Sequence, residues 1–158
     1  MNLTANFTLD EFTQSSKANE FGIDNTPGID EIRNLQKIAD LMQQVRDVCG
    51  GNPVKISSGF RCGDLNRVIG GSATSAHRYG LAADFTIPRF GSPRAICEEL
   101  IAAGLVWDQL ILEHPTTEQP DGKWVHLGLP ILGKPRRHVL TAIKRPKAIH
   151  YAAGLVMP

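Results

Sequence analysis

One long amphipathic segment followed by a series of short apolar runs limits the folds open to this chain. After Thr26-Pro27, apolar residues recur at helical spacing as far as Gly50-Gly51, at positions Ile32, Leu35, Ala39, Met42 and Val45. This spacing predicts an amphipathic helix of about 20 residues. A shorter helix should begin at Thr8, because Glu11 three positions later completes a capping box.

The short apolar runs have the length and alternation of strands. They predict strands at 54–57, 81–87, 108–113, 123–129 and 136–143, with helices near 64–69 and 92–104. Residues 114–122 are polar, contain two prolines and predict a turn. Because helices come first and strands mostly later, the expected fold class is α+β, with a central, mostly antiparallel sheet and helices packed on it.

The length and composition are those of one globular domain. Of the 158 residues, 42% are hydrophobic and 21% are charged, so the chain can bury roughly two-thirds of its unfolded surface without disulfides. Three cysteines, Cys49, Cys62 and Cys97, are odd in number and widely spaced. This excludes a disulfide framework and a CxxC zinc site, and it predicts buried free thiols.

The sequence predicts neither a membrane span nor a secretory signal. No window approaches the roughly 18 consecutive apolar residues that cross a bilayer. Residues 1–6 have neither a basic start nor an apolar stretch. We therefore expect the chain to be cytoplasmic on synthesis and to act elsewhere only after release.

Charge is unevenly distributed along the chain. Residues 122–158 hold seven basic side chains and no acidic one, whereas residues 1–121 hold ten basic and 16 acidic side chains. The seven are Lys123, Lys134, Arg136, Arg137, Lys144, Arg145 and Lys147. Such an end suits a polyanionic partner, either an anionic cell-wall polymer or a nucleic acid, and it equally suits a solvated tail.

Three side chains have the chemistry of a metal site. His77 and Asp84 are seven positions apart with Gly80 between them, and His126 lies in Trp124-Val125-His126. Two neutral imidazoles and one carboxylate can hold Zn²⁺ at about 2.0–2.2 Å and leave a fourth position for water. Spacing alone also allows a purely structural role for the histidines.

These three residues belong to a longer series of motifs. In chain order the series is Ser58-Gly59-Phe60-Arg61, Asn66, Gly70-Gly71, Ser75-x-His77-x-x-Gly80-x-Ala82-x-Asp84 and Trp124-x-His126. The series closely resembles the zinc D-Ala-D-Ala peptidases of the M15 family, which includes dipeptidases, carboxypeptidases and many phage endolysins. Residues 7–12 and 25–27 are similar to the start of its short, single-domain branch, and the resemblance extends to about Leu129.

The resemblance implies a role for each matching residue. It implies that His77, Asp84 and His126 are the ligands of one zinc ion per chain. It also implies that Arg61 binds substrate, by clamping a carboxylate or by stabilising an oxyanion through its paired N–H groups. We expect Ser75 and Trp124 at the same substrate site, although Ser75 could instead cap its loop and Trp124 could instead pack at the cleft wall.

A hydrolase of this type also needs a general base. Several M15 members have a glutamate three residues before the last histidine ligand, but this chain has Lys123 there. Glu113, at the end of a predicted strand, is similar to an acidic residue that short-branch members often have at that strand end. We therefore expect Glu113 to be the base, on a strand that pairs with the one carrying His126.

The resemblance implies a monomeric zinc metallopeptidase that hydrolyses amide bonds of peptidoglycan stem peptides, at either an L-Ala–D-Glu or a D-Ala–D-Ala bond. The expected setting is a phage-type endolysin that acts on the cell wall after release. We expect a peptidase domain at 1–130 and a basic extension at 131–158 that is either part of that domain or a tail.

Two other classes of function stay open. One is a non-catalytic wall-binding or virion structural module that keeps zinc for stability. The other is a nucleic-acid-binding protein, which needs aromatic residues beside the basic charge, and only Tyr151 is near. Zinc content together with the products formed from muropeptides separates the three classes.

Overall fold

The computed structural model describes all 158 residues and contains one six-stranded sheet. In chain order the elements are α1 (Leu9–Thr13), α2 (Ser16–Phe21), α3 (Ile29–Val48), β1 (Lys55–Ser58), α4 (Gly63–Val68), the 3-10 helix η1 (Ala76–Tyr79), β2 (Ala82–Thr86), α5 (Pro93–Ala102), β3 (Gln109–Glu113), β4 (Trp124–Gly128), β5 (His138–Lys144) and β6 (Ile149–Ala153). The strand order is β1-β2-β4-β3-β5-β6, and every neighbouring pair is antiparallel except β3 and β5. The predicted α+β class is confirmed.

Most of the predicted elements are present, and their local signals explain why. The Thr8 backbone N–H donates to the Glu11 carboxylate at 2.7 Å, as the capping box predicts for α1. The long amphipathic segment is the 20-residue α3. Three elements were not predicted, namely α2, η1 and β6. Each is short, and a strand such as β6 gains its stability from pairing with its neighbour rather than from its own sequence pattern.

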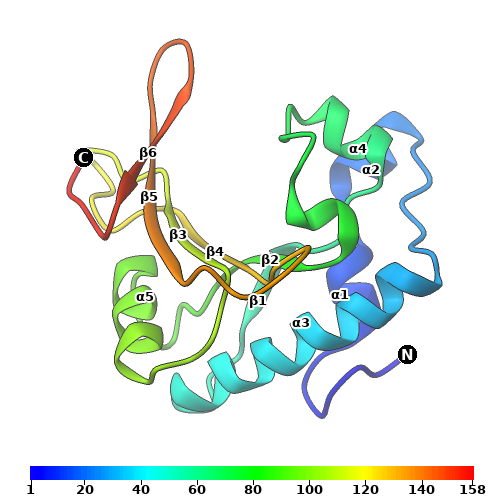
Figure 1. Cartoon of the computed structure of the whole chain (residues 1–158), viewed down its shortest axis with the longest axis horizontal. Coiled ribbons are helices and arrows are strands. Elements are labelled where there is room, and N and C mark those ends of the chain that lie inside the picture. The colour runs from blue at the N-terminus through cyan, green and yellow to red at the C-terminus, as the bar shows by residue number, and fades with distance from the viewer.

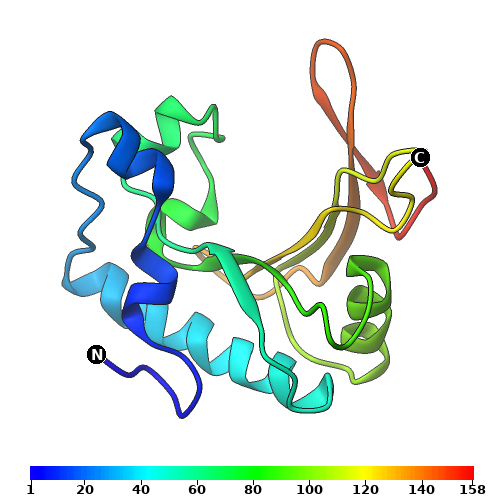
Figure 2. The same cartoon turned by 180° about the vertical axis from the view of Figure 1, so that it is seen from behind.

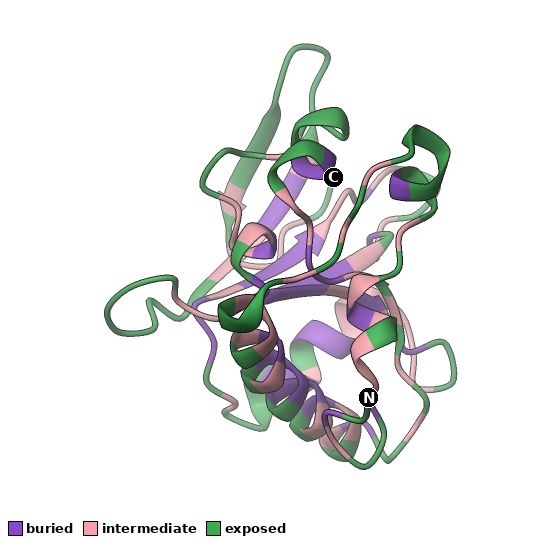
Figure 3. Ribbon diagram, turned by 90° about the vertical axis from the view of Figure 1, so that its right-hand side faces the viewer, coloured by how far each residue is buried: buried purple, intermediate pink, exposed green.

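The two faces of the sheet have different surroundings. Helices α3 and α5 cover one face (Figures 1 and 2), and the apolar core lies between these helices and the sheet. Figure 3 shows the buried residues along the sheet and the inner side of α3. Sheet residues of this core include Ala83, Phe85, Leu110, Leu112, Val125 and Leu127. Because side chains alternate along a strand, the intervening residues, among them Asp84 and His126, lie on the opposite face.

Two parts of the chain rise on either side of this opposite face (Figure 1). Together with the sheet they line a cleft of about 840 Å³. We call residues 59–80, which include α4 and η1, the loop wall. We call residues 129–151, which include β5 and most of β6, the hairpin wall. The lining of the loop wall includes Arg61, Ser72 and Ser75, whereas that of the hairpin wall includes Ile131, Leu140 and Tyr151. The ligand candidates lie between the two walls.

The basic C-terminal residues are joined to the rest of the chain by several contacts. Strand β5 pairs along its length with β3, and β6 pairs with β5. Buried Asp108 accepts the Arg136 backbone N–H at 2.9 Å and the Arg136 guanidinium at 2.5 Å. On α5, the Arg94 guanidinium donates to the Val156 carbonyl at 2.7 Å. Residues after 130 therefore complete the sheet and form one side of the cleft.

Two further sequence expectations concern the membrane and the cysteines. None of the helices has both the length and the apolar character needed to cross a membrane. All three cysteines are free, and Cys49 and Cys97 are buried as expected. Cys62 differs from the expectation in being only partly buried, and its Sγ, at the start of α4, accepts the Leu65 N–H at 3.4 Å.

Candidate active site

His77 is placed by a close approach between the loop wall and α1. A side chain on Gly59 would overlap the Phe12 carbonyl oxygen, so only glycine lets the chain pass this close to α1. The buried His77 Nδ1–H donates to the Gly59 carbonyl at 2.6 Å. This bond fixes the orientation of the ring and leaves Nε2 as the nitrogen that faces the cleft.

The turn between His77 and Asp84 depends on a second glycine. Gly80 has a φ of +67°, in the left-handed region, and a Cβ there would lie 2.8 Å from the Glu31 carbonyl oxygen of α3. The chain turns at Gly80 directly into β2, which carries Asp84. The HxxGxAxD spacing thus places a loop histidine and a strand carboxylate together.

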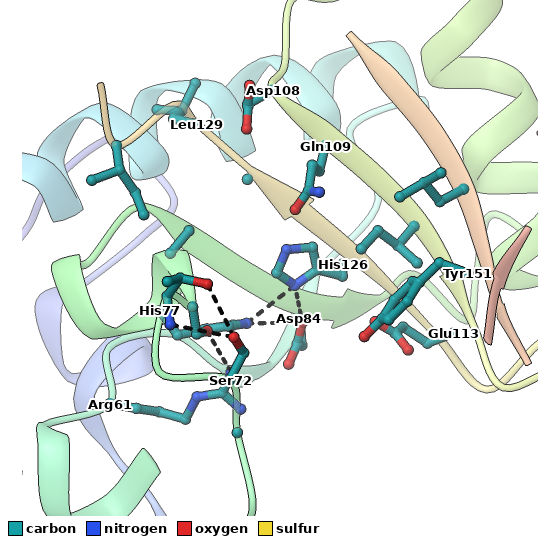
Figure 4. A pocket seen from close by; sticks show the side chains of 18 of the residues that line it. Arg61, Ser72, His77, Asp84, Asp108, Gln109, Glu113, His126, Leu129 and Tyr151 are labelled. Carbon is teal, nitrogen blue, oxygen red and sulfur yellow. Dashed lines mark hydrogen bonds and ion pairs between the residues drawn. The ribbon is translucent and has the colours of Figure 1, made fainter. Parts of the chain in front are cut away.

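His77, Asp84 and His126 converge on one point in the floor of the cleft (Figure 4). Asp84 Oδ1 lies 3.2 Å from His77 Nε2 and 2.9 Å from His126 Nδ1, and the two nitrogens are 3.1 Å apart. The pairing of Asp84 with His126 across β2 and β4 brings the strand ligands side by side. Helix η1 brings His77 to them.

The protonation of these groups suits a cation. Burial lowers the pKa of His77, and its Nδ1–H bond to Gly59 leaves an unshared pair on Nε2 of the neutral ring. Burial alone would raise the pKa of Asp84, but the two histidines hold it below its usual range, so the carboxylate is ionised. When the His77 ring is neutral in this tautomer, its Nε2 lone pair and the carboxylate oxygen both face the point at which a cation would bind.

The donor set also fits zinc in kind and spacing. Two nitrogens and one carboxylate oxygen are ordinary zinc ligands, and ligands of a tetrahedral zinc ion lie about 3.3–3.6 Å from one another. The observed separations are 2.9–3.2 Å. The three residues thus fit a zinc ion with little movement.

Arg61 extends from the loop wall toward this floor (Figure 4). Its backbone N–H donates to the His77 carbonyl at 3.1 Å, and its Nη2 donates to the Ser75 Oγ at 3.3 Å. Its Nε is buried and has no hydrogen-bond partner. Burial lowers the pKa of Arg61, while Asp84 and Glu113 oppose that shift. The guanidinium remains charged, lines the cleft and makes one side-chain hydrogen bond, to Ser75.

Glu113 lies on the other side of the floor, at the end of β3. Its strand pairs with β4, as the sequence predicts, and Glu113 is opposite Trp124. Only 12% of its side chain is exposed. Burial raises the pKa of Glu113 to about 7, since the effects of Asp84, which raises it, and of His126 and Arg61, which lower it, partly cancel. A carboxyl group with this pKa can both accept and return a proton near neutral pH.

Comparison with known families gives a clear result. The family model described as Peptidase M15 matches residues 5–114, which is more than half of the chain. This chain belongs to the M15 peptidase family. No curated protein matches it.

The matched region of this M15 peptidase includes Arg61, His77, Asp84 and Glu113. His126 lies beyond it, on β4, and reaches the others through strand pairing. M15 peptidases are zinc-dependent, which agrees with the donor set on the floor of this cleft.

The remaining sequence candidates line the same cleft. Ser75 lies at the start of η1, where its hydroxyl accepts from Arg61. Trp124 lines the cleft, and its indole N–H is buried without a partner. The edge of the neighbouring His114 ring packs against it, with ring centroids 5.1 Å apart. The structure therefore brings together every predicted site residue.

Sequence reasoning did not assign the hairpin-wall side of the cleft. Tyr151 lines the cleft from β6, and Gln109 lines it from β3 (Figure 4). His114 also lines it, with a φ of +52° that places its Nε2 3.7 Å from Glu113 Oε2. The alternation of Ile149 and Tyr151 is the only sequence signal for Tyr151, and it is too short to define a strand.

Proposed function

We propose that this M15 peptidase is a zinc-dependent hydrolase of peptidoglycan stem peptides. His77, Asp84 and His126 hold the zinc ion, Glu113 is the general base, and Arg61 binds substrate. The observation that carries the proposal is the convergence of three ligand atoms 2.9–3.2 Å apart on the floor of a cleft. The Arg61 guanidinium lies on one side of these atoms, and the Glu113 carboxyl, with its raised pKa, lies on the other.

The chain's own groups supply the proton transfer that amide hydrolysis requires. When bound, zinc supplies a Lewis acid that polarises the amide carbonyl and lowers the pKa of a water molecule to about 7. Glu113 accepts a proton from the attacking water and gives it to the leaving nitrogen as the C–N bond breaks. The burial that raises the pKa of Glu113 to about 7 makes both halves of this transfer accessible at neutral pH.

Arg61 is suited to binding an anionic part of the substrate. Its bond to Ser75 Oγ restricts the guanidinium, which lines the cleft and makes no other side-chain hydrogen bond. Stem peptides carry several carboxylates, which a guanidinium binds through two parallel hydrogen bonds. Ser75 positions Arg61, and Trp124 forms part of the cleft surface beside Glu113.

The hairpin is suited to an anionic cell-wall polymer. Lys144, Arg145 and Lys147 are exposed at the β5–β6 turn, and none of them makes a salt bridge. The turn projects away from the sheet on the open side of the cleft (Figure 1). Attraction between this turn and an anionic polymer would hold the enzyme at its insoluble substrate. We propose that the protein acts in this way as a monomer of the endolysin type. Because β5 pairs with β3, we also propose that residues 131–158 belong to the same domain as the ligands.

Digestion of purified muropeptides tests the proposal. We expect the zinc-loaded chain to release a stem-peptide fragment, removal of zinc with a chelator to stop cleavage, and added zinc to restore it. Mass spectrometry of the fragments shows whether the L-Ala–D-Glu or the D-Ala–D-Ala bond is cut. Zinc bound without any cleavage would instead support the non-catalytic wall-binding module. That alternative is also favoured by Lys123, which stands where several M15 members have a glutamate.

A further inference from the structure

Tyr151 shares a row of the sheet with Glu113. In the pairing of β3 with β5, Glu113 is opposite Ala142, and in the pairing of β5 with β6, Ala142 is opposite Tyr151. Paired residues of neighbouring strands point to the same face of a sheet. All three side chains therefore lie on the cleft face, and the one between Glu113 and Tyr151 is a single methyl group.

The small side chain of Ala142 lets the tyrosine ring reach back toward Glu113. Figure 4 shows the phenol oxygen of Tyr151 directed into the cleft on the same side as the Glu113 carboxyl, and the charge of Glu113 acts on this phenol. Ala142 itself is fully buried, whereas Tyr151 is 50% exposed.

Arg61 and Tyr151 face the floor of the cleft from opposite walls. Arg61 belongs to the loop wall and Tyr151 to the hairpin wall, and both line the cleft. Each of them interacts electrostatically with both Asp84 and Glu113. Both are hydrogen-bond donors, and neither is a proposed zinc ligand. Arg61 carries a positive charge, whereas Tyr151 offers a neutral hydroxyl.

We propose that Tyr151 is a catalytic residue that donates a hydrogen bond to the carbonyl oxygen of the scissile amide as that oxygen gains negative charge. The inference rests on the proposed peptidase function, and it adds Tyr151 to Arg61 as a second hydrogen-bond donor for the substrate. Arg61 is then available for a carboxylate of the substrate. Since Tyr151 lies outside residues 5–114, the donor comes from the part of the chain beyond the family match.

The protonation of the phenol agrees with this role. Burial, followed by the negative charges of Glu113 and Asp84, raises the pKa of Tyr151 above its usual value. The hydroxyl therefore keeps its proton across the pH range in which Glu113 works. A protonated phenol can donate to a developing oxyanion, and no proton needs to be transferred for it to do so.

Steady-state kinetics of Tyr151→Phe on a soluble muropeptide test the proposal. This variant keeps the ring and its packing and removes only the hydroxyl. We expect kcat to fall about 10²-fold, the lower end of what loss of one oxyanion donor costs, while KM stays within about threefold. The matched control is Tyr79→Phe, because Tyr79 is the other tyrosine of the chain and does not line the cleft. It should keep wild-type kinetics.

The possible outcomes separate this proposal from the peptidase proposal. If the wild type cleaves and Tyr151→Phe stays within about threefold in kcat, the donor role is wrong and the peptidase function stands. A rise in KM with unchanged kcat would also overturn the donor role, because the hydroxyl would then bind substrate and transition state equally. If the zinc-loaded wild type cleaves no muropeptide, both proposals are wrong.

Discussion

The two walls of the cleft are built by different means. The loop wall is fixed by close backbone approaches at Gly59 and Gly80 and by buried amides such as that of Asn66, which donates to the Ser72 carbonyl at 2.9 Å. The hairpin wall is held by strand pairing and by the Asp108–Arg136 ion pair, and most of its residues are exposed.

The two walls therefore differ in how strictly their structure limits the residues at each position. The loop wall tolerates few side chains at its glycines, so its sequence is a recognisable motif. The hairpin wall needs only the ability to pair with β3, so its cleft-facing side chains can change without moving the ligands. The proposed zinc ligands and general base thus all lie before residue 129, whereas the residues from 129 onward supply one side of the cleft lining.

The largest effect is expected from the ligands that both walls enclose. His77→Ala and His126→Ala should each reduce bound zinc from one ion per chain to near zero and abolish cleavage, because each removes one of three protein ligands. Elemental analysis after dialysis measures the zinc. His150→Ala, which changes an exposed histidine of β6, is the control. Full zinc occupancy in both ligand variants would refute the assignment.

Glu113 lies beside the hairpin wall, and its loss should have the next largest effect. Glu113→Gln is nearly isosteric, so we expect the fold and the zinc to be retained while turnover falls at least about 10²-fold, the usual contribution of a general base. Glu118→Gln, in the exposed turn before β4, should change turnover little. If turnover survives in Glu113→Gln and is lost in Glu118→Gln, the base is elsewhere.

A pair of glycine variants compares the rigidity of the walls directly. Gly80→Ala, in the turn that joins the loop wall to β2, forces alanine to a φ of +67° and places its Cβ 2.8 Å from a backbone oxygen, and should cost roughly 3 kcal/mol. Gly133→Ala, in the hairpin wall, has a φ of +75° but open space around its Cβ, and should cost about 1 kcal/mol. Thermal unfolding measures both, and equal losses would contradict the comparison.

Neutralising the hairpin turn should affect insoluble substrate only. The triple change of Lys144, Arg145 and Lys147 to Gln should reduce sedimentation with cell walls several-fold at low salt and leave cleavage of a soluble muropeptide unchanged. The difference should disappear at high salt, since the Debye length falls from about 10 Å at 0.1 M to about 3 Å at 1 M. The control neutralises the exposed cations Lys37, Lys55 and Arg89. Equal losses on both substrates would mean that the turn shapes the site itself.

The smallest effect concerns the stability of the metal-free chain. The pKa of Glu113 is raised from 4.5 to about 7 in the folded state, so the folded chain holds this proton more tightly than the unfolded chain. Stability from this source is present below pH 4.5 and is lost as pH rises through about 7. Glu113→Gln should therefore raise the melting temperature at pH 8 by a few degrees and leave it nearly unchanged at pH 4. No difference between these pH values would contradict the burial of this carboxyl.

The sequence predicts the loop wall better than the hairpin wall for a physical reason. Gly59, Arg61, His77, Gly80 and Asp84 lie within one stretch of sequence, and the resemblance to the M15 family rests largely on the motifs in this stretch. The fold class and the strand that carries His126 also follow from local alternation. These parts of the site can therefore be predicted from sequence.

The position of Tyr151 depends on contacts that are not local. Its row on the sheet is set by the parallel pairing of β3 with β5, which brings residues about 30 positions apart into register. The left-handed backbone of His114, which places its ring beside Glu113, likewise has no local signal. The sequence places His114 next to Glu113 but also allows it to be a solvated loop residue, and it gives no reason to place Tyr151 in the cleft.

Strand β6 ends the sheet, and no further strand pairs with its outer side. An open strand edge is a template for pairing with the same edge of another molecule, and natural proteins discourage such pairing with lysines and prolines. The turn that leads into β6 contains Lys144, Arg145, Pro146 and Lys147. Mutual repulsion between these cations would keep neighbouring molecules from joining edge to edge at high concentration. The charges proposed to bind a polymer would thus also protect the protein from self-association.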